Sequence, residues 1–162
     1  MSRPIRRALV AVTLLLAGTL VAAAGPAQAA AATPALINIR TGLNPGFDRI
    51  VLDLSAGTVP GNLNYQLVDE LTADPSGEIV WLTGEYFINV SAYPLVAHDA
   101  NGNPTYTGPA KFRTRNLANV MAIALTGDFE AQTSIGIGVR SRTAVNVFTL
   151  TGPNRVVIDV AH

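Results

Sequence analysis

Short segments in which apolar and polar residues alternate follow one another along this chain. Such a period of two is typical of half-buried β-strands, because successive side chains of a strand point to opposite faces. The segments are separated by turn signals: a break over 42–46, Pro60-Gly61, Asp74-Pro75-Ser76-Gly77 and Asn101-Gly102. The pattern predicts nine short strands, at 36–40, 49–54, 65–68, 79–82, 86–93, 120–125, 133–139, 145–150 and 155–160.

Regular spacing of short strands and turns predicts an all-β domain, either a sandwich or a barrel. Helix signals are confined to a turn or two near 113–119, because β-branched residues and glycine dominate elsewhere. Gly136-Ile137-Gly138 lies inside a strand-like run with no helix after it. We expect a bend or a close backbone approach there, and no nucleotide site.

Two of the segments are near copies of each other: Asp-Arg-Ile-Val-Leu-Asp-Leu-Ser at 48–55 and Asn-Arg-Val-Val-Ile-Asp-Val-Ala at 154–161. If they lie side by side and antiparallel, Arg49 meets Asp159 and Asp53 meets Arg155, whereas a parallel pair opposes like charges. We expect pseudo-symmetric partners in which these four residues are structural, either adjacent in one sheet or equivalent in two packed sheets. Chance similarity between two half-buried strands is the alternative.

The first residues have the pattern of an export signal. A basic start with Arg3, Arg6 and Arg7 precedes an uncharged apolar run over 8–24, and Ala27-Gln28-Ala29 fits a signal-peptidase site. We expect a signal peptide at 1–29, a flexible leader at 30–34 and one β-domain at 35–162. A membrane anchor is the alternative, since the run reaches the lower limit for spanning a bilayer.

Composition narrows the function classes. Removing the three leader arginines from 11 basic residues leaves 8 against 11 acidic ones, a net charge near −3, which argues against a nucleic-acid binder. The chain has no cysteine, so disulfide, thiolate-metal and lipoprotein chemistry are excluded. We expect no cofactor and no stable membrane span once the signal is removed.

Several stretches together resemble a known family: TGLNPGFDRIVLDL at 41–54, VDELTADPSGEIVWLTGEYFINV at 68–90, AHDANGNPTYTGP at 97–109, LTGDFEAQTSIGIGV at 125–139 and FTLTGPNRVVIDVAH at 148–162. They resemble the AMIN-like domain of exported proteins and lipoproteins of high-GC Gram-positive bacteria, over about 36–162. The closing segment also resembles the end of the broader AMIN domain. That resemblance implies a sandwich of two small, roughly symmetric sheets and a non-catalytic module directed to peptidoglycan. The missing lipobox cysteine implies secretion without a lipid tether.

Catalytic and metal motifs are weak. Asp99-Ala100-Asn101-Gly102-Asn103 departs from a calcium loop, since Pro104 stands where the glycine is needed. His98 beside Asp99 is too few ligands for zinc. The pairs Asp69/Glu70 and Asp128/Glu130 are poor acid–base candidates. Asp69 and Glu70 are neighbours on a strand, so their side chains point to opposite faces. Asp128 and Glu130 flank Phe129, which we expect as a buried anchor beside a turn. We expect no metal site and no enzyme.

Binding is the better prospect, through Tyr106, Arg140, Arg142 and Trp81. Aromatic rings stack on ligands, and arginines hold carboxylates. The alternatives are that Trp81 lies in the core, that the arginines are merely solvated, and that Tyr86 lies on the buried face with Ile88 and Val90.

We therefore expect an extracellular, wall-associated domain that binds peptidoglycan or another wall polymer. A protein-interaction module of an envelope assembly is the first alternative, for instance by addition of a partner's strand to a free sheet edge. An uncharacterised hydrolase is the second.

Overall fold

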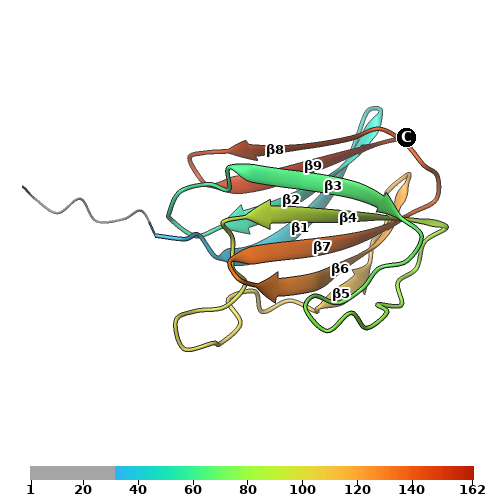
Figure 1. Ribbon diagram of the computed structural model, residues 1–162. Helices are drawn as coiled ribbons and strands as arrows, with labels where there is room; N and C mark the ends of the chain where they lie inside the picture. The colour runs from blue at the N-terminus through green and yellow to red at the C-terminus, as the bar shows by residue number, and fades with distance from the viewer. Residues whose placement is uncertain (1–31) are drawn as a thin grey trace, which may run out of the picture. The chain divides into compact units, whose positions relative to one another are not determined.

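The computed structural model describes residues 32–162, and these residues form two antiparallel sheets packed face to face (Figure 1). One sheet has four strands in the order β1-β2-β9-β8, and the other has five in the order β3-β4-β7-β6-β5. The bounds are β1 (Leu36–Asn44), β2 (Phe47–Leu54), β3 (Asn62–Val68), β4 (Tyr86–Tyr93), β5 (Lys111–Arg113), β6 (Val120–Phe129), β7 (Gln132–Val139), β8 (Val145–Leu150) and β9 (Arg155–Ala161). The predicted all-β sandwich is confirmed.

The core lies between the sheets and is made by the apolar set of each alternating segment. On β2 the side chains of Ile50, Leu52 and Leu54 are buried, and from the facing sheet Ile88 and Ile137 join the same cluster. Burial of one face per strand removes apolar area from water, which is the main favourable term of folding. The spacing of apolar residues along the chain therefore determines which face of each sheet points inward.

The twin segments are β2 and β9, the two central strands of the four-stranded sheet. They pair antiparallel in the predicted register, with Arg49 opposite Asp159 and Asp53 opposite Arg155. Arg49 Nε and Nη2 each donate to a carboxylate oxygen of Asp159 at 2.7 Å. This bidentate ion pair crosses the outer face of the sheet, and Arg49 also lies over the rings of Phe47 and Phe148.

The second expected ion pair is replaced by another. Asp53 accepts hydrogen bonds at 2.7 Å from Arg40 of β1, on the other side of β2, and these hold the pKa of Asp53 below its usual range. Arg155 Nε donates instead to the carbonyl of Pro153. The register was predicted from the repeat alone, but the position of β1 was not, and β1 supplies the nearer arginine.

Three local predictions are wrong. Residues 79–82 form no strand and contribute only an isolated bridge between Ile79 and Thr72, while the three-residue β5 was missed. The break expected over 42–46 is shorter, since β1 continues to Asn44 and turns at Pro45 and Gly46. Residues 113–119 contain no helix, and no helix within 32–162 has the length and hydropathy to cross a bilayer. The expected signal peptide and the start of the leader lie outside the described residues.

The segment 69–85, between β3 and β4, crosses the outer face of the five-stranded sheet and lies in front of β5 and β6 in Figure 1. Asp74 N donates to Thr126 O of β6 at 2.8 Å, and buried Leu71 packs on Gly136 of β7. At Gly138 the backbone of residues 83 and 84 approaches so closely that no Cβ would fit. The expected close backbone approach is confirmed at Gly138, whereas Gly136 makes room for the side chains of Leu71 and Thr126.

Candidate functional site

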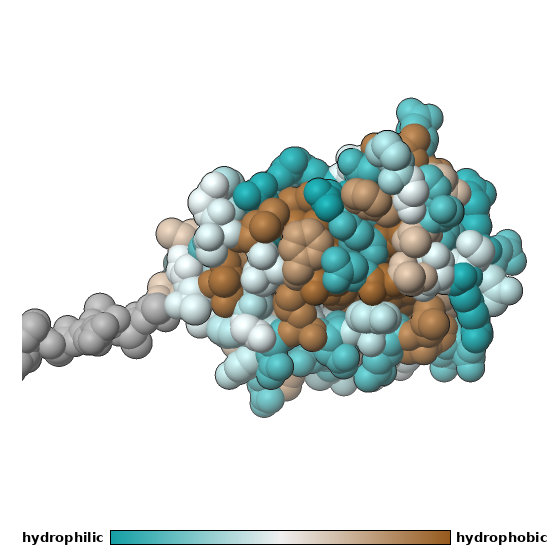
Figure 2. All heavy atoms as spheres, turned by 90° about the horizontal axis from the view of Figure 1, so that it is seen from above, coloured by the Kyte–Doolittle hydropathy of each residue, from teal (hydrophilic) through white to brown (hydrophobic). Residues whose placement is uncertain are grey.

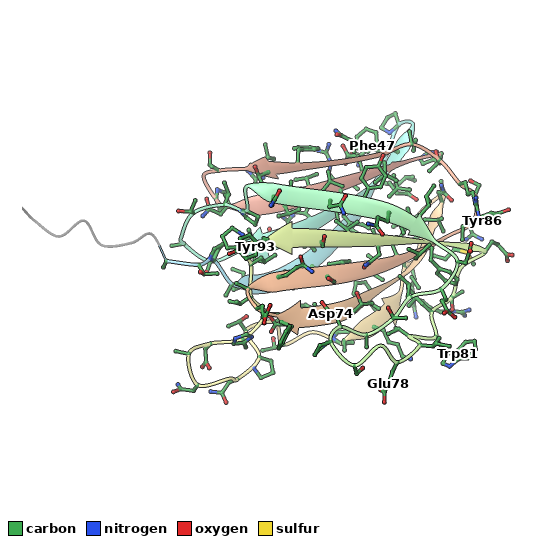
Figure 3. All side chains as sticks on the ribbon, in the orientation of Figure 1. Phe47, Asp74, Glu78, Trp81, Tyr86 and Tyr93 are labelled. Atoms are coloured by element: carbon green, nitrogen blue, oxygen red, sulfur yellow. The ribbon has the colours of Figure 1, made fainter. Side chains whose placement is uncertain are left out.

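Trp81 is the most exposed large aromatic residue of the described chain, with 79% of its surface accessible. The segment 69–85 carries it out over the five-stranded sheet to β5, where Lys111 Nζ donates to Trp81 O at 3.3 Å. Arg113, two residues along β5, donates through Nε to Thr83 Oγ1 at 3.1 Å. Trp81 is therefore not a core residue, and its side chain lies at the surface of the domain (Figure 3).

Arg140 follows β7 and is oriented by a buried polar network that begins at Asp48. Asp48 is fully buried at the end of the core face of β2. Its carboxylate accepts backbone N–H groups from Ala118, Asn119 and Val120 at 3.0, 2.7 and 2.8 Å. A buried charge is tolerated when several donors satisfy it. These bonds fix the loop that leads into β6.

Asn119 extends this network to Arg140. Its side-chain oxygen accepts the backbone N–H groups of Arg140 and Ser141 at 3.0 Å, while its amide nitrogen donates to Ala161 O at 2.9 Å. The guanidinium of Arg140 in turn donates through Nε to Ala118 O at 3.1 Å. The position of the Arg140 guanidinium thus depends on two buried polar residues, Asp48 and Asn119, which carry no recognisable motif in the sequence.

Trp81, Lys111, Arg113 and Arg140 together form what we call the basic–aromatic corner. Two adjoining depressions of about 240 and 220 Å³ lie there, one bordered by Trp81 and Lys111 and the other by Arg140. Thr83 and Arg113 line both. The corner therefore forms one continuous surface, in which the structure brings together two of the four predicted binding residues.

The three cations of the corner are available to an anion. Within residues 32–162, none of them lies within 4.0 Å of a carboxylate, whereas Arg40 and Arg49 are held by aspartates. Of the guanidinium nitrogens of Arg113 and Arg140, only Nε has a partner in the described chain, so the Nη groups remain free to donate. A free guanidinium fork suits a carboxylate or phosphate.

Arg142 lies apart from the corner. Its guanidinium sits 5.0 Å from the centroid of the Tyr86 ring, and its Nη2 is 3.8 Å from Asp69 in an exposed ion pair. Tyr86 is 39% exposed, so its predicted place on the buried face is wrong: it stands at the very start of β4, beyond the end of the core. The exposed Arg142–Asp69 ion pair contributes little to stability.

Tyr106 lies in the core and cannot stack on a ligand. Only 8% of its surface is accessible, and its hydroxyl donates to Pro109 O at 3.3 Å. Burial raises the pKa of the Tyr106 hydroxyl. The loop 104–109, which suggested a surface role for Tyr106, instead places its ring in the hydrophobic core.

The acidic and histidine residues show no converging metal ligands within 32–162. His98 Nδ1 lies 2.6 Å from Asp128 Oδ2 and makes no hydrogen bond to its neighbour Asp99, and the other Asp128 oxygen accepts the backbone N–H of Ala97. Asp99 instead accepts the backbone N–H groups of residues 101 and 103 and so closes its own loop. Phe129, expected as a buried anchor, is 46% exposed.

The fold and this surface define a β-sandwich domain that exposes a cationic, aromatic corner. The family model of the AMIN-like domain matches residues 34–162, and the chain belongs to this family. It is therefore a domain related to the cell envelope. Neither curated proteins nor solved structures gave a match.

Proposed function

We propose that this protein is a non-catalytic, exported domain that attaches to an anionic polymer of the cell wall through its basic–aromatic corner. One observation carries the proposal: three cations with no carboxylate within 4.0 Å in residues 32–162 line the two adjoining depressions, one of which is also bordered by Trp81, the most exposed large aromatic residue of the described chain. Peptidoglycan stem peptides and other wall polymers carry carboxylates or phosphates, which free guanidinium groups bind in a fork. An indole ring adds contact area at little cost in entropy.

Rigid placement supports this role. Arg113 lies on a strand, Arg140 is held through Asn119, and the backbone of Trp81 is tied to Lys111. Groups fixed before binding lose less conformational entropy when the polymer arrives. A domain with a net charge near −3 can still bind an anion, because three cations without a carboxylate partner in residues 32–162 lie together at this corner.

The test is retention of the purified protein on insoluble, protein-free peptidoglycan. We expect Arg113→Gln and Trp81→Ala to weaken retention about tenfold each, in line with the loss of one charge-assisted contact or one stacking contact. Arg142→Gln is the matched control, because it removes the same charge from an exposed arginine outside the corner. Equal losses in Arg113→Gln and Arg142→Gln would show that only net charge matters and would contradict the proposal.

A protein-interaction module is the second candidate. The side chains of Tyr65 and Leu67 are 43% and 47% exposed, although they point to the seam where β3 and β8 meet. Figure 2, viewed from above Figure 1, shows hydrophobic side chains across this face. A protein that is not retained on peptidoglycan would favour this candidate. Release of soluble fragments from the peptidoglycan would instead revive a hydrolase.

A further inference from the structure

A polar groove lies on the outer face of the five-stranded sheet, over β3, β4 and the start of β7. Its two adjoining parts have volumes of about 390 and 370 Å³ and share Asn64, Ser91 and Gln132. The strand register aligns its floor, because Asn64 pairs with Ser91, Gln66 with Asn89, and Ser91 with Ser134. The turn 72–77 of the crossing segment forms one wall. The groove therefore rests on paired strands and one pinned turn.

The side chains of this floor have no partners in the described part of the chain. Within residues 32–162, Asn64, Gln66, Ser91 and Gln132 make no side-chain hydrogen bond, although the register places them next to one another. Asn89 Oδ1 is buried and also lacks a partner. Nearly all buried polar atoms in proteins are satisfied by protein groups or ordered water, so the partner of this acceptor at the base of the groove has to be a water or a ligand group.

The lining restricts the class of ligand. Among residues 32–162, Asp74 is the single charged residue that borders the two parts, so this lining has no cation to attract an anion and one carboxylate to repel it. Amide and hydroxyl groups both donate and accept, which matches a ligand rich in hydroxyl groups. Tyr93, 48% exposed at the far end from Trp81, gives a ring face on which a sugar can stack (Figure 3).

We propose that the polar groove binds the uncharged sugar rings of a glycan. Its volume lies in the range of about 300–1,000 Å³ typical of small-molecule sites. The wall is fixed by Asp74 N to Thr126 O and by Leu71 on Gly136, so the site is formed before the ligand binds. This site is separate from the basic–aromatic corner and does not depend on it.

The probe is the β-1,4-linked tetramer of N-acetylglucosamine, which is uncharged and carries no peptide. Titrated into the ¹⁵N-labelled protein, it is expected to shift amide signals of 62–66, 89–93 and 132–134. Gln66→Ala and Asn89→Ala are expected to weaken the tetramer at least tenfold. Asn89→Ala should not lower the melting temperature, since it removes an unsatisfied buried acceptor. Asn146→Ala, an exposed asparagine on β8 of the other sheet, is the matched control.

The outcomes separate the two sites. Binding of the tetramer with normal affinity to Arg113→Gln, and its loss in Gln66→Ala, would support the groove whatever the peptidoglycan assay shows. No shifts at millimolar tetramer, shifts confined to the corner, or unchanged affinity in both groove variants would overturn the groove. Those results would leave the corner standing, because its test depends on charge and on Trp81.

Discussion

Replacing Gly138 by alanine tests the contact that places the candidate site. A Cβ at this position would lie 2.9 Å from the carbonyl carbon of Thr83 and 3.2 Å from Gly84 Cα, and closer still to the carbonyl oxygen of Thr83. Both sides of the contact are backbone, so no side chain can rotate away. Either β7 or the crossing segment has to move.

The magnitude follows from these contacts. Overpacking costs about 1–3 kcal/mol, and the clash with a carbonyl group belongs at the upper end. Alanine in a strand recovers about 0.5–1 kcal/mol of the conformational entropy that glycine loses on folding. We expect a net loss of about 2 kcal/mol in the free energy of unfolding, which lowers the melting temperature by about 6–10 °C for a domain of this size.

Thermal and urea unfolding of Gly138→Ala measure this loss, and Gly42→Ala in β1 is the control. A Cβ at Gly42 meets no atom within 4 Å, so we expect no loss and a gain of up to about 0.5 kcal/mol. Displacement of the crossing segment should also weaken retention on peptidoglycan, since Trp81 and Thr83 move with it. If Gly138→Ala is as stable as Gly42→Ala, the segment does not lie on β7, and the geometry of the corner is wrong.

Three further predictions concern single residues. Asp48→Asn should lower the free energy of unfolding by about 3 kcal/mol in urea denaturation, because the amide can no longer accept three backbone N–H groups and faces them with a donor. Arg40→Gln should raise the pKa of Asp53 in an NMR titration. The pKa of Asp53 in the native protein lies below the unfolded value of about 4, so the stability from the Arg40–Asp53 pair is present above pH 4 and lost on acidification. Arg40→Gln should therefore lose less stability than the unmodified protein as the pH falls. Trp81, the sole tryptophan, should be quenched by acrylamide almost as strongly in the folded as in the unfolded protein.

Sequence alternation was enough to predict an all-β domain of sandwich or barrel type, and the repeat supplied the β2–β9 register for the case that the two strands are antiparallel neighbours. The reason is physical: a one-residue slip would turn Ile50 and Ile158 to water, and a parallel arrangement would oppose like charges at Arg49. The burial of Asp48 can be read from the alternation in the sequence. Asp48 shares the face of Ile50 and so falls in the core, where a carboxylate has to be satisfied by donors.

The candidate corner could be predicted only in part. Trp81 and Arg140 were singled out by residue type, but Lys111 and Arg113 were not, because β5 has three residues and shows no period. Trp81 comes close to these cations because the irregular segment 69–85 crosses the five-stranded sheet. The alternation of apolar and polar residues does not indicate where an irregular segment will cross a sheet. The glycines of β7 were the available signal, since Gly138 marks where the backbone of the crossing segment comes close and Gly136 where its Leu71 side chain packs.

The two outer faces of the sandwich differ in a way that bears on function. On the four-stranded sheet two opposite-charge pairs neutralise each other, Arg40 with Asp53 and Arg49 with Asp159, and Arg155 donates to the carbonyl of Pro153. On the five-stranded sheet, within residues 32–162, the cations of the corner have no carboxylate partner and the amides of the groove make no side-chain hydrogen bond. The polar groups of the four-stranded sheet are largely satisfied within the protein, whereas those of the five-stranded sheet can still accept a partner. A polar group that has no partner gains most free energy when a ligand supplies one. The five-stranded sheet is therefore the face on which ligands should be sought, with the four-stranded sheet as its support.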